Sequence, residues 1–149
     1  MRKGYVFENE IKRLMSIAEA CGMHWHKNNP NRTVNGIYVA GEPYDYEIFM
    51  PEGVEVFDAK EVSGRAWHLK DKDVRQCSEL CKCAEAANVK AYFVLLFGGS
   101  DVRAVSAAHV KEVLTSGSRT VGKDECTEWD LPKRLKHELS KQQTSCRTA

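Results

Sequence analysis

The chain has 149 residues, of which 42% are hydrophobic and 29% charged, which fits one domain with one core and excludes a disordered chain. A net charge of +1 does not by itself indicate a nucleic-acid partner, so only local clusters of basic residues could do so. No apolar run approaches the roughly 20 residues that span a bilayer, and the N-terminus does not lead into a signal-peptide core, so we expect a cytoplasmic protein without membrane association.

The spacing of apolar residues near the N-terminus predicts a helix over residues 5 to 20, and Gly22 fits a C-terminal stop. Glu8 lies one position off the apolar stripe, so its carboxylate is expected at the edge of the core. Residues 23 to 43 predict a short strand followed by a polar loop.

Two segments rich in aromatic and β-branched residues, 44 to 50 and 54 to 62, predict the strands of a β-hairpin. The residues between them, Pro51-Glu52-Gly53, are typical of a turn.

Helical spacing returns over residues 71 to 88 and predicts a second helix, which Asp71 or Asp73 can cap. The apolar run 91 to 97 predicts a central strand that is covered on both faces. It is followed by an expected edge strand and an expected short helix, at 101 to 106 and 107 to 115.

The order helix, hairpin, helix, strand, strand, helix predicts an α/β fold in which helices flank a mixed central β-sheet. We expect residues 1 to 130 to form this domain. The apolar pattern fades after Gly117, so residues 131 to 149 are expected to be a polar C-terminal tail without fixed structure.

The second hairpin strand carries charges on an otherwise apolar face. Side chains alternate along a strand, so one face is expected to hold Val54, Val56, Asp58, Lys60 and Val62. Buried charges are costly unless they are paired or bind a cation. The Asp and Lys on this face therefore indicate either an ion pair or a cation-binding site.

Hairpin geometry brings a second carboxylate close. If the turn centres on residues 51 to 53, Asp45 falls opposite Asp58 or within about one residue of it. Two carboxylates so placed need positive charge between them, and Mg²⁺, which prefers oxygen ligands, fits. Lys60 lies one pleat further along, where it could orient a metal-bound water or meet a phosphate. The alternative is a surface hairpin with ordinary salt bridges between Lys60 and either Asp.

The segment "YDYEIF…VEVFDAKEV" resembles the signature of PD-(D/E)xK nucleases, an acid on one strand and (D/E)-x-K on the next. The wider pattern is similar to Holliday junction resolvases of the RecU type, and more distantly to archaeal Hjc enzymes. "RKGYVFENEI" resembles their glycine-then-acid first helix, "FDAKEV" their "FEAKET", and "RQCSEL" their helix that begins His-Gln. The resemblance runs from about Arg2 to Trp129 and implies a restriction-endonuclease-like core.

Carried over to this chain, the resemblance implies that Glu8, Asp45, Asp58 and the Ala59 carbonyl hold the metal. It implies Mg²⁺, with Mn²⁺ as a substitute. Lys60 would be the catalytic lysine, and Gln76 would face the site from the next helix. Three positions depart from the resolvase pattern: the triplet begins with Asp in place of Glu, Arg75 replaces His, and Tyr44 replaces Pro.

Basic residues cluster just after the catalytic strand and are candidates to hold DNA phosphates. With two residues at the N-terminus, the candidate DNA-binding set is Arg2, Lys3, Arg65, Lys70, Lys72 and Arg75. The alternative is a solvated loop, because Asp71 and Asp73 dilute the charge. Trp67 could stack on a base or pack in a half-buried position.

The six cysteines are better read as reduced thiols than as a disulfide framework, because no secretion signal is present. Cys77, Cys81 and Cys83 could suggest zinc, but the first two lie on an apolar helix face, where Cys acts as a small hydrophobe. His24 and His26 lack an obvious third ligand.

Together these features predict a structure-specific endodeoxyribonuclease that resolves four-way DNA junctions by paired, symmetric phosphodiester hydrolysis. Two symmetric cuts call for a homodimer. The small size would suit a phage, in which case the enzyme acts in the host cytoplasm. The alternatives are a general PD-(D/E)xK nuclease in restriction or repair, and an inactive DNA-binding module of the same fold.

Overall fold

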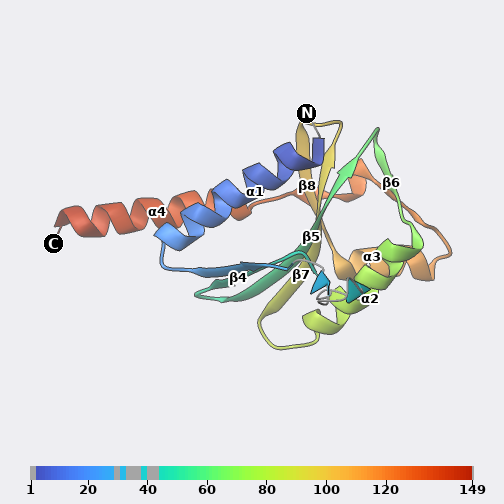
Figure 1. Cartoon of the computed structure of the whole chain (residues 1–149), viewed down its shortest axis with the longest axis horizontal. Helices are drawn as coiled ribbons and strands as arrows, with labels where there is room; N and C mark the ends of the chain where they lie inside the picture. The colour runs from blue at the N-terminus through green and yellow to red at the C-terminus, as the bar shows by residue number, and fades with distance from the viewer. Residues whose placement is uncertain (1–2, 29–30, 33–37, 40–43, 149) are drawn as a thin grey trace.

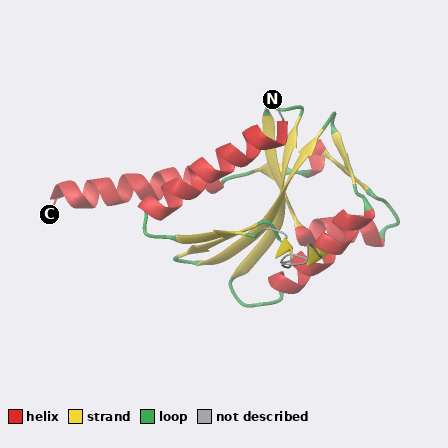
Figure 2. Ribbon diagram, in the orientation of Figure 1, coloured by secondary structure: helices red, strands yellow, loops and turns green. Residues whose placement is uncertain are grey.

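The computed structural model describes residues 3–28, 31–32, 38–39 and 44–148. Its centre is a six-stranded mixed sheet in the order β1-β4-β5-β7-β8-β10 (Figures 1 and 2). The strands are β1 (His24–Lys27), β4 (Tyr46–Met50), β5 (Gly53–Val62), β7 (Val89–Phe97), β8 (Asp101–Ser106) and β10 (Thr127–Glu128). Among the described strands, β5 and β7 are the one parallel pair, so the predicted mixed sheet is confirmed.

Two small ribbons stand beside this sheet. One pairs β2 (Asn31–Arg32) with β3 (Tyr38–Val39), and the other pairs β6 (Ala66–His68) with β9 (Thr120–Gly122). A short 3-10 helix, η1 (Lys123–Glu125), follows β9.

The predicted hairpin forms from β4 and β5, with Met50 opposite Gly53. Gly53 has φ 151°, and a Cβ atom there would lie 2.2 Å from the carbonyl oxygen of Asn88. Glycine is therefore required where the hairpin turn passes the loop that leads into β7.

The chain returns from β5 to the parallel strand β7 through β6 and the helix α2 (Asp71–Ala84), as a parallel pair requires. Strand β8 then lies antiparallel to β7. It was expected at an edge, but β10 covers part of its outer side, with Thr127 opposite Ala104. A strand as short as β10 gives almost no periodic signal in the sequence.

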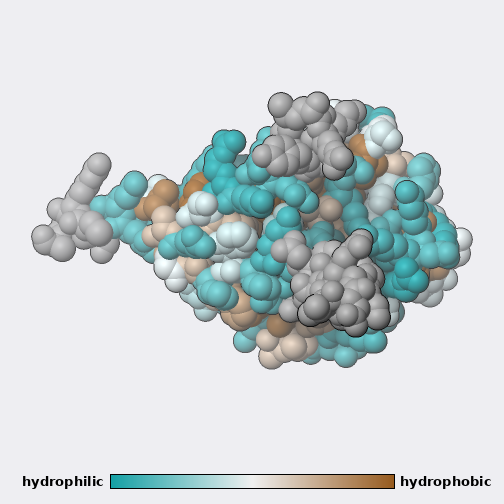
Figure 3. All heavy atoms as spheres, viewed as in Figure 1, coloured by the Kyte–Doolittle hydropathy of each residue, from teal (hydrophilic) through white to brown (hydrophobic). Residues whose placement is uncertain are grey.

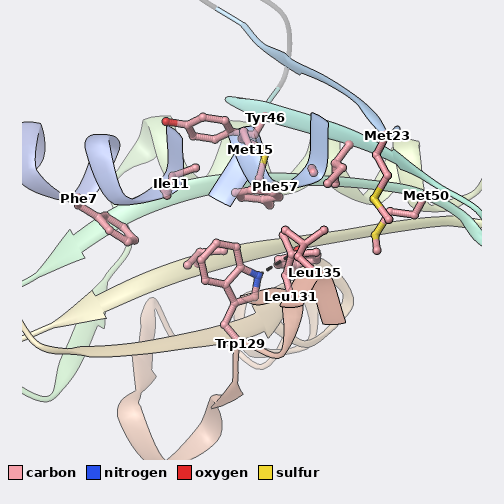
Figure 4. Close-up of a cluster of buried hydrophobic side chains, with 14 of the residues drawn as sticks. Phe7, Ile11, Met15, Met23, Tyr46, Met50, Phe57, Trp129, Leu131 and Leu135 are labelled. Atoms are coloured by element: carbon pink, nitrogen blue, oxygen red, sulfur yellow. Dashed lines mark hydrogen bonds between the residues drawn. The ribbon is translucent and has the colours of Figure 1, made fainter. Parts of the chain in front are cut away.

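Helices cover both faces of the sheet. On one face α1 (Lys3–Ala20) lies beside α4 (Leu131–Thr148), and on the other α2 lies beside α3 (Ala107–Thr115) (Figures 1 and 2). Each pair of helices closes its own buried cluster. The first cluster centres on Tyr46, Phe57 and Trp129, which are in ring contact through Phe57 (Figure 4). The second centres on Trp67, Phe93 and Leu80.

The helix α4 occupies the segment that was expected to be an unstructured tail, so that expectation is corrected. Leu131 and Leu135 are fully buried, and Leu139 packs against the same cluster. The three leucines recur every four residues and hold the polar helix against the sheet and α1. Beyond them α4 extends past the end of α1 (Figure 1). The face of the molecule seen in Figure 3 carries mostly hydrophilic residues in its described part.

In the described part of the chain, no helix combines the length and apolar character that a membrane crossing requires.

Candidate active site

The candidate site lies on the face of the sheet that α2 covers. Val56 and Val62 of β5 belong to the cluster under α2 and α3, whereas Phe57 belongs to the opposite cluster. By alternation, Asp58 and Lys60 share the α2 face with the valines. The predicted placement of both charges on an apolar face is therefore confirmed.

Asp45 and Asp58 meet where β4 begins. Tyr46 pairs with Phe57, which puts Asp45 next to Asp58 in the hairpin register. The backbone N–H of Asp45 donates to Asp58 Oδ1 at 2.7 Å, and the backbone N–H of Ala59 donates to Asp45 Oδ2 at 3.2 Å. Each carboxylate is thus held by the backbone of the other strand, and the predicted proximity of the two acids is confirmed.

Asp58 is fully buried, and its second oxygen, Oδ2, has no hydrogen-bond partner among the described residues. Burial, and then the charge of Asp45, raise the pKa of Asp58 to about 7, although Lys60 and the Asp45 N–H act in the opposite direction. A buried acceptor without a donor is rare in folded proteins and calls for an explanation.

The donor set fits a hard divalent cation. Two carboxylates lie side by side, and one buried oxygen is free to accept a ligand bond. The N–H and C=O of one strand residue point to the same side. Since the Ala59 N–H donates to Asp45, the Ala59 carbonyl also points to the side of β5 on which Asp45 lies. These atoms are oxygens only, the ligand type that Mg²⁺ and Mn²⁺ accept.

The side chain of Lys60 is held by two residues of α2. Its Nζ atom donates to Gln76 Oε1 at 2.6 Å and lies 3.2 Å from Asp73 Oδ1. Gln76 was expected to face the site, and the structure places it there. Asp73 was considered as a helix cap and as an acid that dilutes the basic cluster, but not as a partner of Lys60. Its place beside Lys60 depends on how the crossover packs α2 against β5, which the sequence alone does not reveal.

Glu8 does not join the two aspartates. Its carboxylate is half exposed and pairs with Lys27 of β1 at 3.4 Å. Within the described ranges, no group of three acidic, His or Cys side chains is placed to hold a metal. α1 packs against the other face of the sheet, where Phe7 and Ile11 join the cluster around Phe57. Burial first, and then the charges of Glu8 and Asp45, raise the pKa of Tyr46.

The candidate DNA-binding residues fall into two sets. Lys70 and Lys72 line a groove of about 400 Å³ together with Lys60 and His68. Arg65 is exposed and pairs with Asp124 at 3.5 Å, and Arg75 is exposed on α2. Arg2 lies outside the described residues, and for Lys3 only its backbone place in α1 is described.

Trp67, Cys77 and Cys81 make packing and structural contacts. Trp67 is buried and packs on Phe93, with ring centroids 4.9 Å apart. The thiols of Cys77 and Cys81 both donate to the carbonyl of Ala107, at 3.5 and 3.4 Å. They link α2 to the start of α3.

No protein-family model and no curated protein matches the sequence. Among solved structures, the chain is similar to Hjc of Archaeoglobus fulgidus, a Holliday junction resolvase from an archaeal hyperthermophile. The two are 13% identical, with a TM-score of 0.54, over 83% of this chain and 95% of that one. A likeness at this identity concerns the fold. The expected restriction-endonuclease-like core is confirmed.

Proposed function

We propose that this chain is a metal-dependent, structure-specific DNA endonuclease that resolves four-way junctions by cutting two phosphodiesters at symmetric positions. The observation that carries the proposal is the Asp45–Asp58 pair, with a buried carboxylate oxygen that lacks a partner, on the same strand face as Lys60. The likeness in fold to a junction resolvase supports the choice of substrate, as an analogy.

Asp45, Asp58 and the Ala59 carbonyl would hold Mg²⁺, for which Mn²⁺ would substitute. Glu8 would complete the set only if it exchanged Lys27 for the metal. Bound there, the ion would polarise the scissile phosphate and lower the pKa of a coordinated water.

Lys60 would meet the reacting phosphate. Lys60 lies two residues after Asp58 on the same face of β5, so its ammonium group can donate a hydrogen bond to a phosphate oxygen or to the attacking water. Lys70 and Lys72 would hold neighbouring phosphates along the groove that they line with Lys60. Arg65 and Arg75 would extend this basic surface, and Arg2 and Lys3 remain further candidates for phosphate contacts.

The proposed enzyme is a homodimer, since paired cuts across a junction require two sites related by a two-fold axis. A general PD-(D/E)xK nuclease would use the same residues and differs only in its DNA substrate. An inactive binding module would not need Asp45, Asp58 and Lys60 together, so their joint presence disfavours that alternative.

The test is cleavage by Asp58→Asn in Mg²⁺. The change keeps the shape and the acceptor for the Asp45 N–H, but removes the charge that would hold the metal. We expect cleavage to fall by about 100-fold or more, while junction binding in EDTA changes little. Glu112→Gln, which removes an exposed carboxylate from α3, is the charge-matched control. Wild-type rates in Asp58→Asn would refute the proposed site.

A further inference from the structure

The ammonium group of Lys60 is held by two acceptors on one helix. Asp73 and Gln76 lie one turn apart on α2, and both reach Lys60 Nζ, at 3.2 and 2.6 Å. A lysine ammonium has three N–H donors. In the described part of the chain, no acceptor other than these two contacts Lys60 Nζ, so the third N–H is left for another partner.

Asp73 divides its two oxygens between two tasks. Its Oδ1 atom pairs with Lys60, and its Oδ2 atom accepts the backbone N–H of Lys70 at 2.9 Å, at the start of α2. Its side chain is only 9% exposed and that of Lys60 only 18%, so water weakens this ion pair far less than a surface pair. The first turn of α2 is thereby tied to the strand that carries Asp58.

We propose that Asp73 is a positioning residue for catalysis. With Gln76 it fixes two N–H groups of Lys60 and turns the third away from α2, toward the strand face that carries Asp58. This inference rests on the proposed nuclease function. Without Asp73 the long lysine side chain would sample several rotamers, and the donor would be in place for only part of the time.

A helix cap alone would account for the contact between Asp73 and Lys70, but not for the contact between Asp73 and Lys60. A capping Asp needs only to accept a hydrogen bond from a backbone N–H at the start of the helix. Here the other oxygen pairs with a partly buried side chain of the proposed site, the ammonium group of Lys60. The two roles predict different consequences when the charge is removed and the cap is kept.

Asp73→Asn makes that separation, because the amide oxygen can still accept the Lys70 N–H. Positioning predicts that kcat on a four-way junction falls by about 10- to 100-fold, while KM and the Kd for the junction in EDTA stay within about twofold. Asp73→Glu, which keeps the charge, should recover most of the lost kcat. Glu79→Gln, an exposed acid further along α2, is the matched control and should leave kcat unchanged.

A second measurement does not depend on activity. In protein with ¹³C-labelled lysine, the ε-methylene signal of Lys60, assigned by its loss in Lys60→Ala, should be shifted from the signals of exposed lysines. In Asp73→Asn it should move to the position of the exposed lysines, and in Glu79→Gln it should not move.

The outcomes separate this inference from the function on which it rests. Suppose that wild type cuts junctions and that Asp58→Asn does not. If Asp73→Asn then has the kcat and the Lys60 signal of wild type, the role of Asp73 is refuted and the proposed function is not. If wild type cuts no DNA, the proposed function fails. In that case a Lys60 signal that shifts in Asp73→Asn would still support the ion pair as a positioning contact. A lower melting temperature in Asp73→Glu, with kcat and melting temperature of Asp73→Asn unchanged from wild type, would indicate a structural cap alone.

Discussion

At the level of single residues, the site is a local source of instability. The Asp58 side chain is shielded from water, lies against a second carboxylate and has one oxygen without a hydrogen-bond donor among the described residues. Ionisable residues whose pKa is strongly shifted by burial and a nearby charge are often found in functional sites. We therefore expect the Asp58 carboxylate, which the proposed chemistry requires, to lower the stability of the metal-free protein.

This has a consequence for stability against pH. The pKa of Asp58 is about 7 in the folded protein against an ordinary value of 3.8 for an Asp side chain in water, so the folded state binds this proton more tightly. The destabilisation is absent well below pH 4, grows as the pH rises between these values and is complete above about pH 7. It amounts to an order of about 4 kcal/mol at most.

Asp58→Asn, measured in EDTA, should therefore unfold at a higher temperature than wild type at pH 8, and the difference should shrink to near zero at pH 4. Thermal unfolding followed by circular dichroism tests this, with Glu112→Gln as the control that should show no gain at either pH. A variant that is less stable than wild type at pH 8 would show that the Asp58 carboxylate is well satisfied without a metal.

Lys60→Ala should separate turnover from metal binding. An ammonium group cannot ligate a cation and repels one nearby, so calorimetry should find Mg²⁺ bound as tightly as in wild type or more tightly. Turnover should fall by about 100-fold or more, because the donor to the reacting phosphate is gone. Loss of Mg²⁺ binding in this variant would mean that Lys60 supports the metal site itself.

At the level of elements, the hairpin was the best predicted part. Alternating apolar residues and a Pro-Glu-Gly turn define β4 and β5 in the sequence, and the register that brings Asp45 to Asp58 follows from the turn. The packing of α1 and α2 on opposite faces of the sheet does not follow from such local patterns. Placement of Glu8 and Asp73 depends on that packing, and for this reason it could not be predicted.

The helix α4 was missed because its sequence is mostly polar. Besides its three leucines, an ion pair between Arg134 and the buried Glu55 holds it on the face opposite the candidate site. Arg134 donates to both carboxylate oxygens of Glu55 on β5, and Glu55 Oε1 also accepts the Tyr92 hydroxyl at 2.8 Å. Trp129 Nε1 in turn donates to the Tyr92 oxygen at 3.1 Å (Figure 4). These contacts join residues up to 79 positions apart, which no local pattern can indicate.

Arg134→Gln should destabilise the fold by about 3–5 kcal/mol, because it leaves the Glu55 carboxylate buried without its cation. The double variant Glu55→Gln/Arg134→Met removes both charges and should recover most of that loss. Urea unfolding followed by tryptophan fluorescence would measure both. A loss below about 1 kcal/mol in the single variant, or an equal loss in the double variant, would contradict a locking role for this pair.

At the level of the whole molecule, the sheet separates two tasks. The face under α1 and α4 holds the larger aromatic cluster and the Glu55–Arg134 pair, whereas the face under α2 holds the acids and the lysine. Strand β5 takes part in both, since Glu55 and Phe57 point one way and Asp58 and Lys60 the other. This division allows the site to carry unfavourable charges while the opposite face stabilises the strand.

Substrate choice also belongs to the whole molecule. The described elements form one domain around a six-stranded sheet, and the chain has a net charge of +1. The proposed dimer would place two copies of the site about a two-fold axis, and a four-way junction offers two symmetric positions for them.

The most direct test compares end-labelled four-way, Y-shaped and linear DNA of matched sequence, in Mg²⁺ and moderate salt, with wild type and Asp58→Asn in parallel. Wild type should nick the four-way junction at paired, symmetric positions near the crossover and cut the linear duplex far more slowly. Asp58→Asn should leave all three intact, and light scattering should find a dimer on the junction. Equal cleavage of linear duplex, or a monomer on the junction, would contradict junction resolution and favour a general nuclease.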